Sequence, residues 1–206
     1  MNLQAIDLGL IDFQKAHTKQ IELIENIYKT RKSDYLIFCE HPAVITLGRR
    51  TNAENLLKNE SFLKEKSIPV IKTNRGGDIT CHSPGQMVIY PLIDLKKTFK
   101  DLHRYFRFLE TVVIDALAKI DITAQRKEGL TGVWVKEKKI ASIGIGVRRW
   151  ISFHGMAINL NNSLEVFSFM KPCGLDVEMI SAKKILSQDI DRDNFKHIII
   201  EQFKKI

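Results

Sequence analysis

The sequence predicts an α+β fold in a single domain, and three observations lead to this prediction. Strand-like and helix-like segments follow one another without the strict alternation of a doubly wound sheet. The chain has 206 residues, of which 44% are hydrophobic, so it can form one full core. No Pro/Ser-rich linker, repeat or low-complexity tract marks a boundary, so residues 1–206 are expected to form one domain.

The first half of the chain begins with an amphipathic helix and continues with strands. Apolar residues recur at helical spacing between Phe13 and Ile27, which predicts a helix over roughly Asp12 to Thr30. Short apolar runs bounded by turn residues then predict strands. These runs lie at 35–39, 43–47, 68–72 and 86–92.

The second half contains the clearest helix of the sequence. A continuous apolar stripe from Leu102 to Ile120, with Asp101 as its N-cap, predicts a core helix over 101–120. Strands are expected at 132–135, 139–147 and 152–160, and further helices near 177–186 and 192–203.

Charge and cysteine content narrow the classes of function. The net charge of +8 permits a nucleic acid, a membrane surface or an acidic protein as partner. RNP-type aromatic motifs and zinc-finger spacing are missing, so nucleic acid is not expected. The N-terminus lacks the layout of a signal peptide and no apolar run approaches a membrane span, which predicts a soluble cytoplasmic protein without a membrane partner. The three separated cysteines predict reduced thiols rather than disulfides.

Polar residues are dense around a glycine pair in the segment 75–86. Gly76 and Gly77 allow positive φ and close approach to a ligand, and Pro84-Gly85 adds a second turn. Two plain surface turns are the alternative interpretation. If 78–82 is extended, Asp78, Thr80 and His82 share one face, whereas Ile79 and Cys81 share the other. Cys81 is therefore expected to pack in the core rather than pair with His82.

A basic segment follows at 136–150, with five basic residues and one acidic residue. A solvated hairpin is the ordinary interpretation of such a run. Lys139 differs, because it directly precedes small residues and Gly144, where a backbone can meet a ligand. Gly144-Ile145-Gly146 is not a dinucleotide loop, since Arg149 stands where the third glycine should fall.

Cys173 lies between Pro172 and Gly174, directly before a predicted helix. A thiol in such a turn is accessible, and the positive end of a helix dipole favours the thiolate. Such a thiolate can hold an acyl group as a thioester. An inert buried thiol is the alternative. No metal site is expected, because the six histidines are scattered and H-E-x-x-H is missing.

Together these segments resemble the lipoyl(octanoyl) transferases, the octanoyltransferases of lipoate biosynthesis. The resemblance rests on four segments in family order, with His41-Pro42 and Thr46-Leu47-Gly48 upstream. These are Arg75-Gly76-Gly77 with Thr80, His82 and Pro84-Gly85-Gln86; Lys139-Ile140-Ala141-Ser142-Ile143-Gly144; Phe153-His154-Gly155-Met156-Ala157 with Asn159; and Pro172-Cys173-Gly174.

The resemblance implies a mixed sheet flanked by helices, related to the catalytic domains of biotin and lipoate protein ligases. It implies transfer of octanoyl from octanoyl-acyl carrier protein to the lysine ε-amine of lipoyl domains, without ATP or another cofactor. These lipoyl domains include those of 2-oxoacid dehydrogenase E2 subunits and the glycine cleavage H protein.

The family's catalytic nucleophile falls on Cys173, and its lysine partner falls on Lys139. The implied substrate-binding residues are Arg75, Gly76, Gly77, Asp78, Ile79, Thr80, Cys81, His82, Ser142, Ile143, Gly144, Gly155, Met156 and Ala157. The chain departs from the family at Cys81, which is usually aromatic, and at Ser83, which is usually glycine.

Two other enzyme classes stay open at this point. An ATP-dependent lipoate-protein ligase shares the implied fold and a lysine like Lys139, but it needs no thiol such as that of Cys173. A cysteine hydrolase using Cys173 with His82 or His154 is the second alternative. A requirement for ATP, or the absence of an amine acceptor, distinguishes these alternatives from the transferase.

Overall fold

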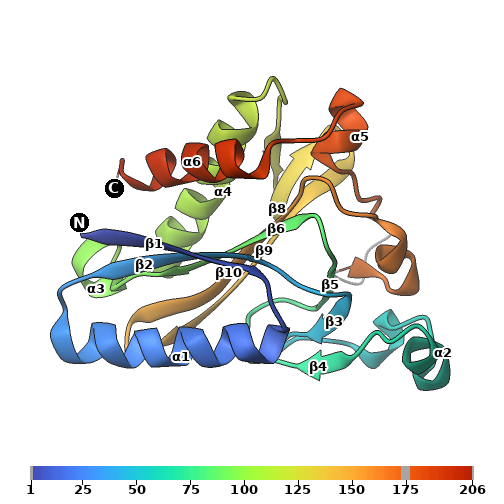
Figure 1. Cartoon of the computed structure of the whole chain (residues 1–206), viewed down its shortest axis with the longest axis horizontal. Helices are drawn as coiled ribbons and strands as arrows, with labels where there is room; N and C mark the ends of the chain where they lie inside the picture. The colour runs from blue at the N-terminus through green and yellow to red at the C-terminus, as the bar shows by residue number, and fades with distance from the viewer. Residues whose placement is uncertain (1, 173–176, 206) are drawn as a thin grey trace.

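The central feature of the computed structural model, which describes residues 2–172 and 177–205, is a seven-stranded mixed sheet (Figure 1). Across the sheet the strands are β1 (Leu3–Leu10), β2 (Asp34–Glu40), β6 (Gln86–Leu92), β10 (Ile151–Asn159), β9 (Lys138–Arg148), β8 (Leu130–Val135) and β7 (Gln125–Lys127). The edge strand β1 is parallel to β2, and the other neighbours are antiparallel.

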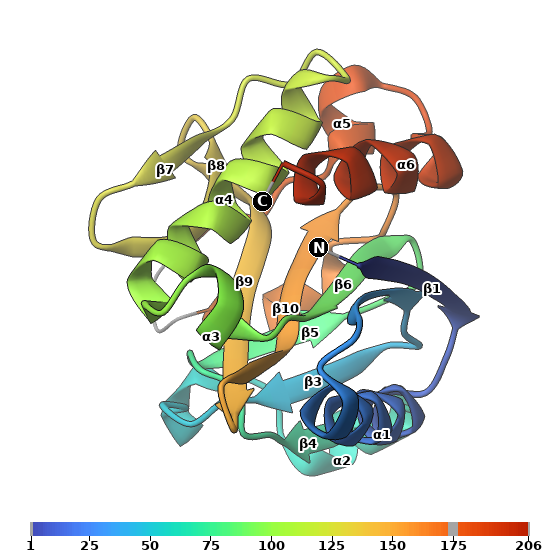
Figure 2. The ribbon, with the colours of Figure 1, turned by 90° about the vertical axis from the view of Figure 1, so that its left-hand side faces the viewer.

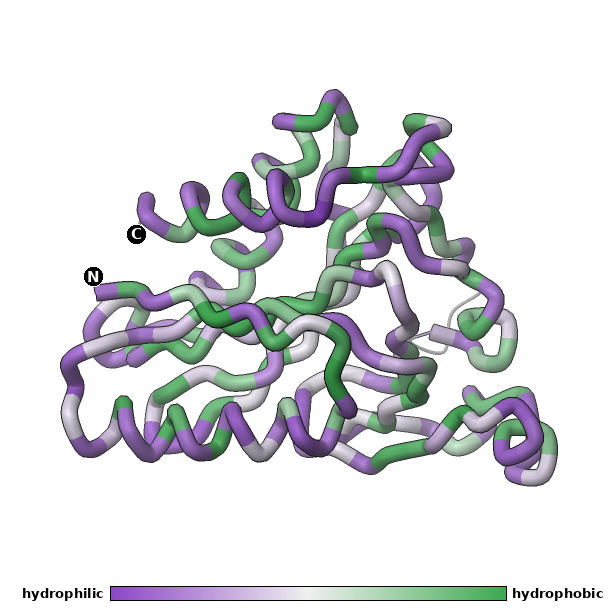
Figure 3. The backbone as a smooth tube through the Cα atoms, viewed as in Figure 1, coloured by the Kyte–Doolittle hydropathy of each residue, from purple (hydrophilic) through white to green (hydrophobic). Residues whose placement is uncertain are grey.

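Helices cover both faces of this sheet. Helix α1 (Phe13–Thr30) lies on one face, and α4 (Leu102–Ala118) and α6 (Arg192–Phe203) lie on the other, as Figure 2 shows. Hydrophilic and hydrophobic residues alternate along α1 (Figure 3), and Asp12 accepts hydrogen bonds from the first-turn amides as the N-cap. The shorter helices are α2 (Glu60–Glu65), α3 (Leu95–Thr98), α5 (Ala182–Leu186) and two 3₁₀ turns, η1 (Ala53–Asn55) and η2 (Glu165–Phe169).

A second sheet of three strands lies at one end of the first. Its order is β4 (Val70–Lys72), β3 (Val44–Leu47) and β5 (Ile79–His82). Its apolar side packs with η2 in a separate hydrophobic cluster that includes Ile45, Ile79 and Phe167. The turn that joins β4 to β5 reaches the large sheet, where the Gly76 amide donates to the Ile145 carbonyl at 2.8 Å. The two sheets therefore meet at β9 and β10, the strands that carry the motifs containing Lys139 and Gly155.

The structure confirms the predicted α+β class with a mixed sheet and flanking helices, and it confirms the helices α1, α4 and α6. One prediction is wrong, because the helix expected from Val177 begins only at Ala182. Instead, Lys139 donates its amide to Glu178 O and accepts from Ile180 N, so residues 178–180 extend along β9. In the described part of the chain, no helix is long and apolar enough to span a bilayer.

Candidate active site

A cavity of about 520 Å³ lies where the small sheet meets β9 and β10. Thirteen of the fourteen predicted substrate-binding residues line it, and so does Lys139. The thirteen are Arg75, Gly76, Gly77, Asp78, Ile79, Thr80, His82, Ser142, Ile143, Gly144, Gly155, Met156 and Ala157. The fold thus brings three separate sequence segments to one cavity.

The structure does not bring Cys81 to this cavity. Its side chain is fully buried in the cluster beneath the small sheet, as the alternation of β5 predicts, and burial raises its thiol pKa well above the ordinary value. Ser83, the other departure from the family, does not have a positive φ, so its side chain fits without backbone strain. Its hydroxyl donates to the Ser163 carbonyl at 3.3 Å. Neither Cys81 nor Ser83 lines the cavity.

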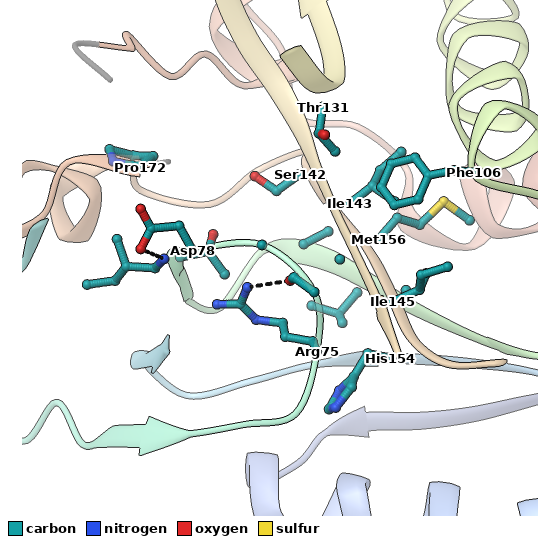
Figure 4. Close-up of a pocket in the computed structure, with 18 of the residues that line it drawn as sticks. Arg75, Asp78, Phe106, Thr131, Ser142, Ile143, Ile145, His154, Met156 and Pro172 are labelled. Carbon is teal, nitrogen blue, oxygen red and sulfur yellow. Dashed lines mark hydrogen bonds between the residues drawn. The ribbon is translucent and has the colours of Figure 1, made fainter. Parts of the chain in front are cut away.

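The turn at Arg75–Asp78 is held in place by its own polar groups (Figure 4). The buried Arg75 guanidinium donates to the carbonyl and the hydroxyl of Thr46, and also to the Gly76 carbonyl. Gly144 faces the turn without a side chain, and a β-carbon there would lie 2.9 Å from the Gly76 carbonyl oxygen. A principal role of Arg75 is therefore to hold the cavity wall in shape.

A chain of buried amides connects His82 with the segment that flanks Lys139. The Gln86 side-chain amide donates to the Asn159 side-chain oxygen at 2.9 Å. The Gln86 side-chain oxygen therefore faces His82 and accepts a hydrogen bond from its Nδ1 at 2.8 Å. Asn159 in turn donates to the Ile180 carbonyl at 3.1 Å. The cavity wall and residues 178–180 therefore form one hydrogen-bonded unit.

His154 enters the cavity from β10 with an unusual backbone conformation. Its φ of 53° lies in the left-handed region, which a histidine adopts only where surrounding contacts favour it. The buried Gln20 of α1 accepts the His154 amide at 2.8 Å. The ring Nε2 donates to the Asn74 side-chain oxygen at 2.9 Å, so Nδ1 is its acceptor nitrogen.

The buried histidines of this region are neutral at physiological pH. Burial, assisted by the nearby His41, lowers the pKa of His82 to about 3. Burial also lowers the pKa of His154 to about 3, assisted by His17 and Arg75. Within residues 2–172 and 177–205, no three His, Cys, Asp or Glu side chains converge as a metal site.

Lys139 brings an amine into the cavity from the start of β9, although only 3% of the residue is exposed. The Nζ atom lies 5.5 Å from the ring centroid of Trp134, its cross-strand neighbour on β8. A buried ammonium next to an aromatic face is stabilised by the cation–π interaction. The amine is therefore held at the cavity wall rather than extended into solvent.

The predicted nucleophile Cys173 lies outside the described residues. The preceding residue, Pro172, lines the cavity, and the chain after the gap returns to Lys139 through residues 178–180. The helix expected from Val177 begins at Ala182, so residues 177–181 do not provide the predicted helix N-terminus. Lys139 lines the same cavity as Pro172, so its amine can provide cationic support for a thiolate in this cavity.

The remaining lining residues were not predicted to bind substrate, although His154 and Pro172 belong to motifs quoted in the sequence analysis. These lining residues are Phe13, Arg50, Val88, Tyr90, Phe106, Gly129, Leu130, Thr131, Ile145, His154 and Pro172. In Figure 4, Phe106 and Met156 stand at one side of the cavity, whereas Asp78 and Pro172 stand at the other. Phe106 belongs to the apolar stripe of α4, so only the tertiary structure distinguishes it from a core residue.

The cavity at the junction of the two sheets combines apolar side chains such as Phe106 and Met156 with the Lys139 amine, so it can hold an acyl chain beside a reacting amine. The family model described as the lipoyl protein ligase A/B catalytic domain matches residues 12–204. An octanoyltransferase of Maridesulfovibrio salexigens is 38% identical over 99% of this chain and 96% of its own. One of Syntrophotalea carbinolica is 41% identical over 97% of this chain and 92% of its own. The chain belongs to the octanoyltransferases of this family, and it is therefore an acyl-transferring enzyme.

Solved structures show the same fold at low sequence identity. A bipartite lipoate protein ligase from Thermoplasma acidophilum, described with its E2 lipoyl domain, has a TM-score of 0.72 and 18% identity over 99% of this chain and 82% of its own. A biotin protein ligase from Aquifex aeolicus has a TM-score of 0.56 and 15% identity over 100% of this chain and 69% of its own. The predicted relation to both ligase folds is confirmed.

Proposed function

We propose that this chain takes octanoyl from octanoyl-acyl carrier protein as a thioester on Cys173 and passes it to the lysine ε-amine of a lipoyl domain. The observation that carries the proposal is the position of the Lys139 amine. It lines the cavity together with Pro172, while the Lys139 backbone pairs with residues 178–180. One end of the segment that contains Cys173 thus lines the same cavity as the Lys139 amine, and the other end pairs with the Lys139 backbone.

In the first step the Cys173 thiolate attacks the thioester carbonyl of the donor. The carbon–sulfur bond to the carrier breaks, the carrier sulfur takes a proton from the Lys139 ammonium and leaves as a thiol, and Lys139 becomes a neutral amine. In the second step the acceptor amine attacks the Cys173 thioester and loses a proton to Lys139, and the Cys173 thiolate departs. The product is an amide, and no ATP is consumed because the donor thioester is already activated.

The expected protein partners fit the charge of the chain. A net charge of +8 attracts acidic partners, and acyl carrier proteins and many lipoyl domains are acidic. The lipoyl domains of 2-oxoacid dehydrogenase E2 subunits and the glycine cleavage H protein are the proposed acceptors. A catalytic thiol that must stay reduced is compatible with a cytoplasmic location.

Mass spectrometry of the intact protein tests this mechanism. Incubation with octanoyl-acyl carrier protein is expected to leave an octanoyl adduct on Cys173, and an apo-lipoyl domain is expected to remove it without ATP. Lys139→Ala should slow both steps while the protein stays folded. An adduct that survives in Cys173→Ser, or transfer that needs ATP, would overturn the mechanism, and the latter result would favour the ligase.

A further inference from the structure

Gly132 of β8 lies directly against the side chain of Lys139. A β-carbon at this position would lie 2.6 Å from Lys139 Cε and 3.3 Å from Nζ, whereas ordinary contact begins at 3.4 Å. Alanine here would therefore press on the amine end of the lysine, about 0.8 Å too close at Cε. The φ of Gly132 is +113°, a conformation that residues with a side chain rarely adopt.

The backbone at Gly132 cannot easily retreat from Lys139. The same β-carbon would lie 2.5 Å from the Ala141 carbonyl oxygen on β9. On the other side, the Gly132 amide faces the Glu110 carboxylate of α4 at 3.4 Å. Glu110 is only 1% exposed and accepts hydrogen bonds from Arg107 and Arg126, so it is itself fixed. Gly132 is thus held between α4 and β9.

Trp134, two residues further along β8, contacts the lysine from a second direction. Its ring is 2% exposed and directly opposes Lys139 in the strand register. The register shifts between Val133 and Trp134, and this irregularity brings both Gly132 and Trp134 within reach of one lysine side chain. Lys127 stacks on the same indole at 4.8 Å, which helps to keep the ring in place.

We propose that Gly132 and Trp134 are positioning residues that hold the Lys139 amine at the cavity. Gly132 provides the space that the lysine side chain occupies, and the Trp134 ring fixes the direction of the amine. The expected effect on catalysis rests on the proposed function of Lys139. The packing of Gly132 and Trp134 against Lys139 does not depend on that function. A displacement of about 1 Å at a catalytic group can cost on the order of 100-fold in rate.

The test compares Gly132→Ala, Lys139→Ala and the double variant. Two quantities are measured: the single-turnover rate of octanoyl transfer to an apo-lipoyl domain, and the pH dependence of Cys173 alkylation by iodoacetamide. Gly132→Ala is expected to slow transfer about 10- to 100-fold and to move the alkylation midpoint upward, in the direction of Lys139→Ala. In the Lys139→Ala background, Gly132→Ala should lower the transfer rate less than twofold further. It should cause no further shift of the alkylation midpoint.

Gly9→Ala is the matched control. Gly9 also has a positive φ, of +60°, but a β-carbon there would meet nothing within 4 Å, so wild-type rates are expected. If Lys139→Ala leaves transfer unchanged, the proposed function of Lys139 fails. If Lys139→Ala slows transfer and Gly132→Ala does not, or if their effects simply multiply, the positioning role fails.

Trp134 provides a second pair of variants if Gly132→Ala does not fold. Trp134→Phe retains an aromatic face and should lower the transfer rate only severalfold. Trp134→Leu removes that face and should produce a larger loss, together with the upward shift of the alkylation midpoint. Equal rates and midpoints in Trp134→Leu and the wild type would overturn the proposal.

Discussion

Acidification is expected to destabilise the fold through His82 and His154 in the cavity wall. Burial lowers the pKa of both rings from 6.5 to about 3 in the folded chain. Below pH 6.5 these histidines therefore bind protons in the unfolded chain but not in the folded chain. As the pH is lowered from 6.5 to about 3, the free energy of unfolding decreases. Above pH 6.5 both rings are neutral in both states, and their contribution no longer changes with pH.

The size of this loss follows from the two pKa values. At pH 5.5, one unit below the unfolded pKa, each ring costs about 1.4 kcal/mol, and the pair costs about 3 kcal/mol. His41 and His17 act in the same direction, since burial lowers the pKa of both. Asp34, whose pKa burial raises, acts in the opposite direction. A net loss of a few kcal/mol is a large part of the stability of a domain.

Urea unfolding at pH 7.5 and pH 5.5, followed by tryptophan fluorescence, measures the loss. His154→Asn, whose new side chain tolerates positive φ, should reduce the difference between the two pH values by about 1.4 kcal/mol. His103→Gln, which replaces an exposed histidine on α4, is the matched control and should leave the difference unchanged. Equal free energies of unfolding at both pH values in the wild-type protein would refute the argument.

Three further predictions concern packing around the cavity. Phe106→Ala should shift substrate preference toward longer acyl chains by about fourfold per added methylene. The measurement is the ratio of kcat/KM for decanoyl and octanoyl donors, and an unchanged ratio would contradict this prediction. In Gly155→Ala the new β-carbon would clash with the Ile89 carbonyl, which should lower the free energy of unfolding by about 2 kcal/mol or more. A urea midpoint equal to that of the wild type would contradict this close contact. Asn159→Ala leaves the Gln86 amide without an acceptor and should cost about 2 kcal/mol and slow transfer, whereas wild-type stability would exclude the network.

The sequence was sufficient to predict the helices and strands whose apolar pattern lies within the element itself. Helix α4 was predictable because its stripe is continuous and Asp101 caps it. Strand β1 was missed because it is a half-exposed edge strand, stabilised by pairing with β2 about 30 residues away. Residues 177–181 were wrongly predicted as the start of the helix that begins at Ala182, because their apolar residues fit a helical period while the backbone pairs with β9.

The site was predictable where its residues form contiguous motifs. Glycines next to polar residues marked the turn at Arg75–Asp78 and the strand that carries Gly144, whereas Gly155 was implied by the family resemblance. Phe106 and Tyr90 could not be found in this way, since each looks like an ordinary core residue in its own element. The same applies to Gly132, whose significance depends on a side chain on another strand.

The two halves of the proposed catalytic pair share the pairing between Lys139 and residues 178–180 and differ in their other supports. Lys139 is held within the sheet by β8, whereas the segment containing Cys173 joins two anchored ends. The Lys171 amide donates to the Asn55 carbonyl at 2.8 Å on one side, and Ile180 pairs with Lys139 on the other. Substitutions in β8 should therefore alter proton transfer at Lys139 and leave the anchoring bond at Asn55 intact. A substitution at Asn55 keeps this backbone carbonyl but removes the side-chain hydrogen bond to Asp78 in the cavity wall, so it should lower the rate without moving the pH profile.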